Sequence, residues 1–197
     1  MQVFCYFPIG VHQLNKLDLH VACIHLSEGN IIAYPTEAVW GLGCDPNNQT
    51  AVAKLLELKN RSVEKGLILV AAHHSQISDL LKPLSSRQKE LLQNTWPHPV
   101  TWIIPDSLNL IPHWIKGSNN SVAIRISSHP VVQGLCSQFG GPVVSTSANI
   151  AGGAETRSRS MVEEQFGSNI AYIVEGNLGD EPRPSEIRDL VSLEILR

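Results

Sequence analysis

The 197-residue sequence lacks paired cysteines, long apolar runs and an excess of positive charge. Its four cysteines are scattered (Cys5, Cys23, Cys44 and Cys136), which excludes a zinc finger and the disulfide framework of a small secreted protein. We therefore expect four reduced thiols. No stretch approaches the roughly 20 apolar residues of a membrane helix. Residues 1–9 are apolar but lack the basic start and small-residue cleavage site of a signal peptide. These absences predict a cytoplasmic protein with no membrane partner.

Common nucleotide and metal motifs are missing as well. There is no Walker A loop and no G-x-G-x-x-G, and the eight histidines form no H-E-x-x-H. The formal net charge of −3 gives no overall positive field that would attract nucleic acid or anionic lipid. Any anion site must therefore come from a local cluster of basic residues.

The residues that are present predict one packed α/β domain. Hydrophobic residues make up 43% and charged residues 17% of the chain, which suits a folded core. Helical periodicity is expected at 14–28, from about 48, and at 87–94, 130–139 and 161–166, the last opened by a Ser160–Glu163 capping box. Short apolar runs predict strands at 31–34, 67–70, 101–104, 122–126, 143–144, 172–174 and 190–196. Because several connections are short, we expect a mixed parallel and antiparallel sheet.

Residues 34–43 (YPTEAVWGLG) join a strand-ending proline to polar side chains and two glycines. Ligands of open α/β sheets bind beyond strand ends, and glycine lets the backbone approach a ligand closely. A tight turn capped by Thr36 or Glu37 explains the same pattern. These residues alone leave both interpretations open.

Basic residues gather after the second expected helix, at Lys59, Arg61 and Lys65. A lysine acts as a point charge and an arginine as a rigid fork, so Lys59 and Arg61 can hold separate oxygens of a polyphosphate. The alternative is surface pairing, for example of Glu57 with Arg61, which stabilises a helix by only about 0.3–0.5 kcal/mol. Taken alone, this segment favours the surface interpretation.

Two expected strands carry polar side chains that need partners. Thr101 opens one of them and either binds a ligand or is an ordinary β-branched strand residue. His98, between two prolines, is either a general base or, more commonly, a solvated loop side chain. Arg125 points to the face opposite its apolar neighbours and requires an anion, which is either a structural carboxylate or a ligand.

Residues 145–149 (STSAN) follow a buried strand and carry three hydroxyls and an amide. Such side chains, together with free backbone N–H groups at a strand end, form an array of donors suited to phosphate or carboxylate oxygens. A serine nucleophile would need a base and a G-x-S-x-G elbow, and neither Ser145 nor Ser147 lies in one. A self-capping turn is the alternative, but the density of donors favours a ligand site.

Five motifs in order resemble the YrdC/TsaC family of threonylcarbamoyl-AMP synthases, in its short bacterial form. They are YPTEAVWGLG, the K-x-R of Lys59 and Arg61 with KGLILV, PVT, STSAN and PSEIRD, and they extend from about residue 30 to 189. The resemblance implies an α/β fold with a twisted mixed sheet, flanking helices and a large concave basic cavity. It places one YrdC-like domain at 11–197, after an N-terminal extension (1–10) of unknown role.

The same resemblance implies a reaction. L-Threonine, bicarbonate and ATP would give threonylcarbamoyl-AMP, pyrophosphate and water, for the t6A modification at position 37 of tRNA. Mg²⁺ would arrive with the ATP phosphates, and no protein side chain is expected to bind a metal. TsaD with TsaB and TsaE would act downstream, and weak tRNA or double-stranded RNA binding is a further expectation.

The family's functional residues carry over motif by motif. Those expected to contact threonine are Thr36, Arg125, Ser145 and Ser185. Those expected to contact ATP are Lys59, Arg61, Thr101, Ser147 and Asn149, with Lys59 and Arg61 as the catalytic pair and Lys65 as a further cation.

Several positions depart from the family pattern. His98 stands where a glycine is usual between the prolines, and Ser62 stands where a proline often follows K-x-R. Ala151-Gly152 replaces the usual Ser-Gly, which removes one hydroxyl.

Two rival functions fit parts of the sequence. A non-catalytic module could bind tRNA or double-stranded RNA with the same cavity, although the negative net charge and the lack of interleaved aromatics count against it. Hydrogenase-maturation carbamoyltransferases contain a similar domain. They add an acylphosphatase module and zinc-finger cysteine pairs, which this sequence lacks.

Overall fold

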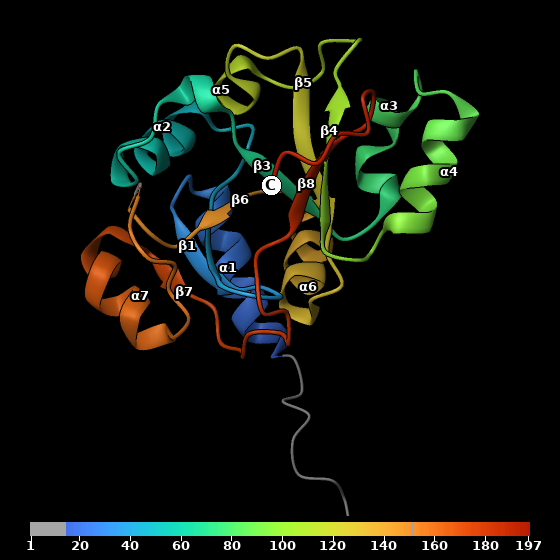
Figure 1. Cartoon of the computed structure of the whole chain (residues 1–197). Helices are drawn as coiled ribbons and strands as arrows, with labels where there is room; N and C mark the ends of the chain where they lie inside the picture. The colour runs from blue at the N-terminus through green and yellow to red at the C-terminus, as the bar shows by residue number, and fades with distance from the viewer. Residues whose placement is uncertain (1–14, 151) are drawn as a thin grey trace, which may run out of the picture.

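The computed structural model describes residues 15–150 and 152–197 (Figure 1). The predicted extension at 1–10, Cys5, the expected helix start at Leu14 and the Ala151 departure lie outside the described residues.

Helices and strands alternate along most of the chain. The helices are α1 (Lys16–Ser27), α2 (Gln49–Leu58), α3 (Ser78–Leu81), α4 (Ser86–Thr95), α5 (His113–Lys116), α6 (Pro130–Phe139) and α7 (Arg159–Phe166), with 3₁₀ turns η1 (Val63–Lys65), η2 (His74–Ile77) and η3 (Gly167–Asn169). The strands are β1 (Ile32–Pro35), β2 (Trp40–Gly43), β3 (Ile68–Ala71), β4 (Val100–Pro105), β5 (Ser121–Ile126), β6 (Val143–Ser147), β7 (Tyr172–Ile173) and β8 (Glu186–Asp189).

All eight strands form one sheet in the order β7-β1-β2-β6-β3-β5-β4-β8. The pairs β1–β7, β3–β5 and β4–β8 are parallel, and the other four pairs are antiparallel. The predicted α/β fold with a mixed sheet is therefore confirmed.

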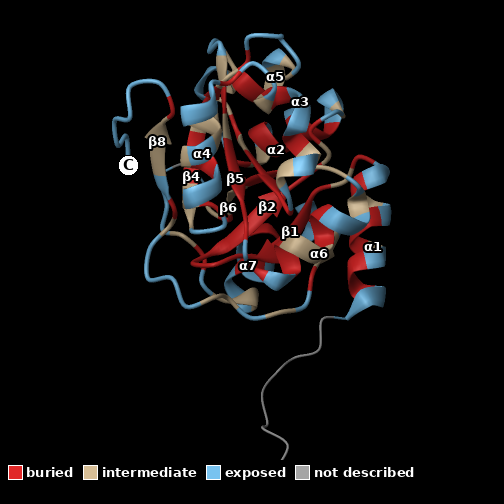
Figure 2. Ribbon diagram, turned by 90° about the vertical axis from the view of Figure 1, so that its right-hand side faces the viewer, coloured by how far each residue is buried: buried red, intermediate tan, exposed pale blue. Residues whose placement is uncertain are grey.

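The sheet buries both of its faces, but unequally. Helices α1 and α6 pack on one face against Ile32, Tyr34, Val70 and Val143, which alternate with residues of the opposite face. On the opposite face, a larger core unites strand residues with α2, α4, α5 and α7. Figure 2 shows the central strands and the inward sides of α1 and α6 as buried, the outward sides of these helices as exposed, and β8 as intermediate. The part of the first face that α1 and α6 leave uncovered carries the pocket described below.

Local sequence signals explain most helix ends. The side chains of Asn15 and Asn48 accept hydrogen bonds from the first turns of α1 and α2, and Pro130 occupies the first turn of α6 as predicted. The predicted capping box at Ser160 is wrong, because Ser160 lies inside α7. Ser158 caps that helix instead by accepting a hydrogen bond from the Met161 backbone N–H at 3.3 Å.

Three strand expectations need correction. β2 was not expected, because its WGLG sequence lacks the β-branched residues that mark a strand. The expected final strand at 190–196 is wrong. β8 precedes it, and the segment then turns back, leaving Val191 and Ile195 exposed. β6 continues through Ser147, so the STSAN segment begins inside a strand and not beyond its end.

The two glycines of YPTEAVWGLG have different surroundings. Tyr34 pairs with Gly41 across β1 and β2, and Gly41 has room for a Cβ and lines the pocket described below. A Cβ at Gly43 would lie 2.8 Å from the Tyr34 ring, so no larger residue fits without movement. The Tyr34 hydroxyl donates a hydrogen bond to the Val144 carbonyl at 3.1 Å. Packing therefore explains Gly43, and the approach of the backbone to a ligand stays a prediction for Gly41.

Within residues 15–150 and 152–197, no helix is both long and apolar enough to cross a lipid bilayer.

Candidate functional site

A pocket of about 330 Å³ opens on the sheet face that α1 and α6 cover only in part. Its floor comes from neighbouring strands in register. Ile68 of β3 lies opposite Ala123 of β5 on one side and Ser145 of β6 on the other, and Ile103 of β4 lies opposite Ala123. The volume is at the lower end of the roughly 300–1,000 Å³ typical of small-molecule sites. The sheet thus supplies a pocket, although not the large cavity that was expected.

Positive charge dominates the lining. Arg61, Arg125 and Arg197 reach the pocket from different parts of the chain, together with Lys65 and Lys116. Among the described residues, Glu155 is the one acidic side chain that lines it. This is the local basic cluster that an anion site requires in a protein with net negative charge.

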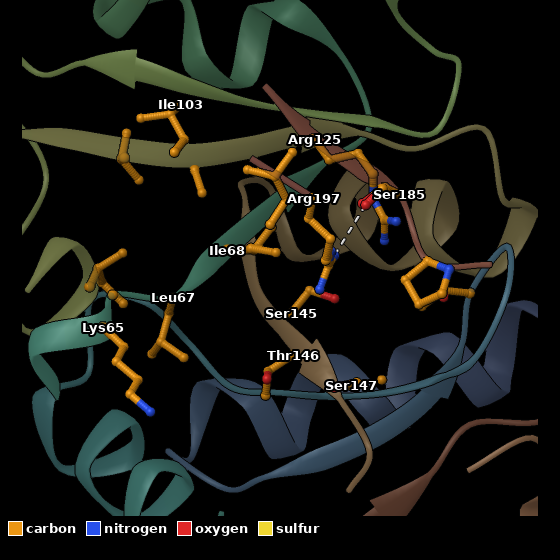
Figure 3. Close-up of a pocket in the computed structure, with 18 of the residues that line it drawn as sticks. Lys65, Leu67, Ile68, Ile103, Arg125, Ser145, Thr146, Ser147, Ser185 and Arg197 are labelled. Carbon is orange, nitrogen blue, oxygen red and sulfur yellow. Dashed lines mark hydrogen bonds between the residues drawn. The ribbon is translucent and has the colours of Figure 1, made fainter. Parts of the chain in front are cut away.

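The structure brings the predicted site residues together. Seven of the ten line the pocket, namely Thr36, Arg61, Lys65, Arg125, Ser145, Ser147 and Ser185. The other three lie directly behind lining residues. Lys59 and Asn149 contact Ser147, and the Thr101 hydroxyl forms a 2.8 Å hydrogen bond with that of Ser185. In Figure 3, Arg125, Ser145, Ser185 and Arg197 converge at one end of the pocket, and Lys65 lies at the other.

Lys59 connects the end of α2 to the STSAN segment. Its Nζ donates hydrogen bonds to the carbonyls of Ser147 and Asn149, the latter at 2.7 Å, and the residue is only 3% exposed. Burial, together with the nearby charge of Arg61, lowers the pKa of Lys59 to about 8. Lys59 is thus both a structural link and a titratable cation beside the pocket.

Arg61 is held more loosely than Lys59. Its Nη2 donates a 2.8 Å hydrogen bond to the Gly66 carbonyl, and its buried Nε has no hydrogen-bond partner among the described residues. Burial and the neighbouring charge of Arg197 both lower the pKa of Arg61. An anion in the pocket would relieve this repulsion and supply the missing acceptor.

Arg125 has the structural carboxylate partner that the sequence left open, and it also faces the pocket. Its Nη2 lies 3.4 Å from Glu37 Oε2 inside the protein, and the side chain also lines the pocket. The residue is 8% exposed, and its Nε has no hydrogen-bond partner in the described part of the chain. A buried guanidinium with unused N–H groups beside a cavity is suited to a carboxylate or phosphate ligand.

The hydroxyl groups differ in how far they are already used. Thr36 Oγ1 donates to the Val39 carbonyl at 2.8 Å, and Ser147 Oγ donates to Asn149 Oδ1 at 2.6 Å. The backbone of Ser145, Thr146 and Ser147 pairs with β3 and β2. The expected array of free backbone N–H groups is therefore reduced to side-chain donors.

Three charged lining residues were missed from the sequence. Arg197 enters from the C-terminal segment and donates a 3.1 Å hydrogen bond to the Ser185 carbonyl (Figure 3). Lys116 is largely committed to Asp106, 2.8 Å away, and Glu155 follows the STSAN segment. None belongs to a recognisable motif, and only the fold brings them to the pocket. His98, in contrast, is exposed and does not line the pocket.

A basic pocket on a mixed sheet defines the class, an α/β protein whose pocket is lined by residues of several short motifs. The chain belongs to the Sua5/YciO/YrdC family, whose sequence profile, described as telomere recombination, matches residues 25–197.

Known proteins support this assignment over most of the chain. A threonylcarbamoyl-AMP synthase of Cellvibrio japonicus is 51% identical over 172 residues, covering 87% of this chain and 90% of that protein. One from Coxiella burnetii is 46% identical over 172 residues, covering 87% and 92%.

Solved structures agree with the fold. P. abyssi Sua5 complexed with L-threonine superposes with a TM-score of 0.87 at 29% identity, covering 94% of this chain and 55% of that protein. E. coli YciO superposes with a TM-score of 0.81 at 20% identity, covering 93% and 89%, which supports the fold alone.

Proposed function

We propose that the protein is a threonylcarbamoyl-AMP synthase, a nucleotidyltransferase that uses L-threonine, bicarbonate and ATP. The observation that carries the proposal is the meeting of separate motifs, above all Arg61 and Arg125, in one pocket of the family fold. Relatives named as threonylcarbamoyl-AMP synthases favour this function over an RNA-binding module.

The proposed reaction needs no protein nucleophile. The threonine nitrogen and bicarbonate form a carbamate and water. A carbamate oxygen then attacks the α-phosphorus of ATP, and the bond from that phosphorus to pyrophosphate breaks. The protein's tasks are to hold two anions in line and to balance charge on the departing pyrophosphate.

The pocket offers a division of these tasks between its two ends. Arg125 with Thr36, Ser145 and Ser185 would receive the threonine carboxylate and hydroxyl, and the cations Arg61 and Lys65 would receive ATP phosphates. Lys59, Thr101, Ser147 and Asn149 would complete the ATP side, three of them from behind the lining. Arg197 lies close enough to Arg61 to lower its pKa, so it adds charge between the two ends.

Mg²⁺ fits this site only as a companion of ATP. Within the described ranges, no group of three or more His, Cys, Asp or Glu side chains could hold a metal ion, and Glu155 is the one carboxylate in the lining. Mg²⁺ commonly retains waters and binds through substrate phosphates with few protein ligands, which agrees with such a pocket. The product would pass to TsaD with TsaB and TsaE, and weak tRNA or double-stranded RNA binding is part of the same proposal.

The test is pyrophosphate release by the pure protein supplied with ATP, Mg²⁺, bicarbonate and L-threonine. We expect release that stops when either threonine or bicarbonate is omitted, with threonylcarbamoyl-AMP detected by mass spectrometry. Release that ignores both omissions would identify an ATPase instead. No release, combined with strong and steeply salt-dependent RNA binding, would support the RNA-binding alternative.

The pKa of Lys59 predicts how the reaction depends on pH. Below pH 8 its amine is mostly charged, and above pH 8 it becomes neutral in the free protein. If the charge is needed for ATP phosphates, kcat/KM for ATP falls as pH rises through about 8, by up to about tenfold per pH unit. The fall in kcat comes at higher pH, because bound phosphates stabilise the ammonium.

Steady-state rates at saturating threonine and bicarbonate from pH 6.5 to 9.5 measure this effect. The threonine amine becomes more reactive as pH rises, so it cannot produce the expected fall. Lys59→Arg is the control, because a guanidinium stays charged throughout this range. A wild-type profile that is flat or rising through pH 8 would contradict the prediction.

A further inference from the structure

Behind Arg125 lies a group of buried polar residues that the proposed site does not use. Glu37, Ser127 and His129 are 5%, 0% and 6% exposed, and none of them lines the pocket. Glu37 comes from the YPTEAVWGLG motif, and the other two follow β5, which carries Arg125. Charged groups are rarely buried to this degree without a defined partner.

The hydrogen bonds of this group are directional. The Ser127 hydroxyl donates to Glu37 Oε1, and the same oxygen of Ser127 accepts a 3.1 Å hydrogen bond from the His129 backbone N–H. The His129 ring is fixed in turn through Nε2, 3.0 Å from the Asn177 carbonyl. One carboxylate oxygen of Glu37 is thereby held in place. The other, Oε2, has no hydrogen bond among the described residues and faces Arg125 Nη2 at 3.4 Å.

The backbone around Glu37 is held from a second direction. The Gly179 N–H donates to the Thr36 carbonyl at 3.0 Å, and the Glu181 N–H donates to the Glu37 carbonyl at 3.1 Å. A Cβ at Gly179 would lie 2.9 Å from the Glu37 carbonyl oxygen, so the two segments are in close contact. The backbone of Glu37 cannot shift relative to Arg125 without moving these segments as well.

The electrostatics agree with a fixed ion pair. Burial opposes ionisation of Glu37, but the charge of Arg125 and the Ser127 hydroxyl outweigh it and hold the pKa of Glu37 below its ordinary value. Burial lowers the pKa of His129, despite the nearby carboxylate, so its ring adds no competing charge at neutral pH. The Glu37 carboxylate is therefore the partner that orients Arg125 when the pocket is empty.

We propose that Glu37 is a positioning residue, which binds one edge of the Arg125 guanidinium and thereby presents its remaining N–H groups to the carboxylate of the amino-acid substrate. Ser127 holds Glu37 in the required orientation. Glu37 itself touches no substrate. The inference rests on the proposed function, because it takes the ligand at Arg125 to be the carboxylate of threonine.

Glu37→Gln is the test, because it keeps the shape of the side chain and removes its charge. We expect KM for threonine to rise about tenfold or more, since a misaligned guanidinium loses a charge-assisted, two-point contact. The Kd for ATP, measured by calorimetry, should stay within about twofold of wild type, because the ATP cations lie elsewhere. Ser127→Ala removes only the hydroxyl that holds the carboxylate, and we expect a smaller rise in the same KM.

Asp18→Asn is the matched control. Asp18 is also a buried carboxylate, 7% exposed, which accepts hydrogen bonds from the Tyr172 hydroxyl and, at 3.0 Å, the Glu175 N–H, but it lies on α1 away from the pocket. We expect it to lower the thermal midpoint and leave the KM for threonine unchanged. A general loosening of the fold would instead raise the KM for threonine in Asp18→Asn as well.

The outcomes separate this inference from the proposed function. Wild-type protein that releases no threonine-dependent pyrophosphate would overturn both. Wild-type turnover with a threonine KM in Glu37→Gln within twofold of normal would overturn the positioning role alone. A parallel loss of affinity for threonine and ATP would also overturn it. If Glu37→Gln fails to fold, an unchanged threonine KM in Ser127→Ala would overturn the positioning role in its place.

Discussion

Replacing Lys59 with alanine is expected to abolish nearly all pyrophosphate release and to destabilise the fold. The rate should fall by about 10²–10³-fold, the usual result of removing one preorganised charge from a reaction that develops negative charge. The carbonyls of Ser147 and Asn149 would lose their buried donor, which costs roughly 1–3 kcal/mol. Initial rates and urea unfolding measure the two effects separately.

Lys54→Ala is the control for this substitution. Lys54 lies on the same helix, α2, but is exposed. Its removal should leave the rate at the wild-type value. The free energy of unfolding should stay within about 0.5 kcal/mol of wild type. Normal turnover in Lys59→Ala would indicate that Lys59 has only a structural role. Lost turnover at full stability would show that its bonds to the STSAN segment contribute little to folding.

Arg61→Ala should give the complementary result, a similar loss of turnover with little loss of stability. Among residues 15–150 and 152–197, its guanidinium makes one hydrogen bond, to Gly66, and is repelled by Arg197. We expect the free energy of unfolding to change by about 1 kcal/mol or less. The rate should fall by roughly 10²–10³-fold, because the substitution removes a charge that we propose faces the departing pyrophosphate.

Arg87→Ala serves as the control for Arg61, because Arg87 is an exposed arginine on α4 and does not line the pocket. The same rate and unfolding measurements apply to both variants. Turnover in Arg61→Ala within twofold of wild type would contradict the proposed role of Arg61 in ATP binding. Because α2 ends at Leu58, before Arg61, an i,i+4 pair with Glu57 inside that helix does not form.

Sequence patterns predicted the elements whose burial follows a simple period. The central strands β3, β5 and β6 are apolar runs, and α6 was predicted with its observed bounds. β2 was missed because a glycine such as Gly43 is explained only by its close neighbours on the adjoining strands, the Tyr34 ring and the Val144 carbonyl. Pairing across strands is a tertiary fact that local propensity does not contain.

The candidate site also contains residues that sequence motifs predict and residues that only the fold reveals. Its predicted residues came from short motifs, and the structure brings those motifs to one pocket. Arg197 was missed because the preceding apolar residues were taken for a strand, whereas the segment turns back and carries Arg197 to the pocket. The sequence left a structural and a ligand partner open for Arg125. The structure supplies Glu37 on one side and an open pocket on the other.

The continuation of β6 through Ser147 has a consequence for substrate geometry. Ser145 and Ser147 are two residues apart on one extended strand, which fixes their separation along it at about 7 Å. Both neighbours of β6 are hydrogen-bonded to it, so this spacing cannot change without breaking the sheet. β6 therefore fixes the distance between the two serines. It would set how far apart the amino acid and the nucleotide bind, and an insertion of one residue would turn one serine into the core.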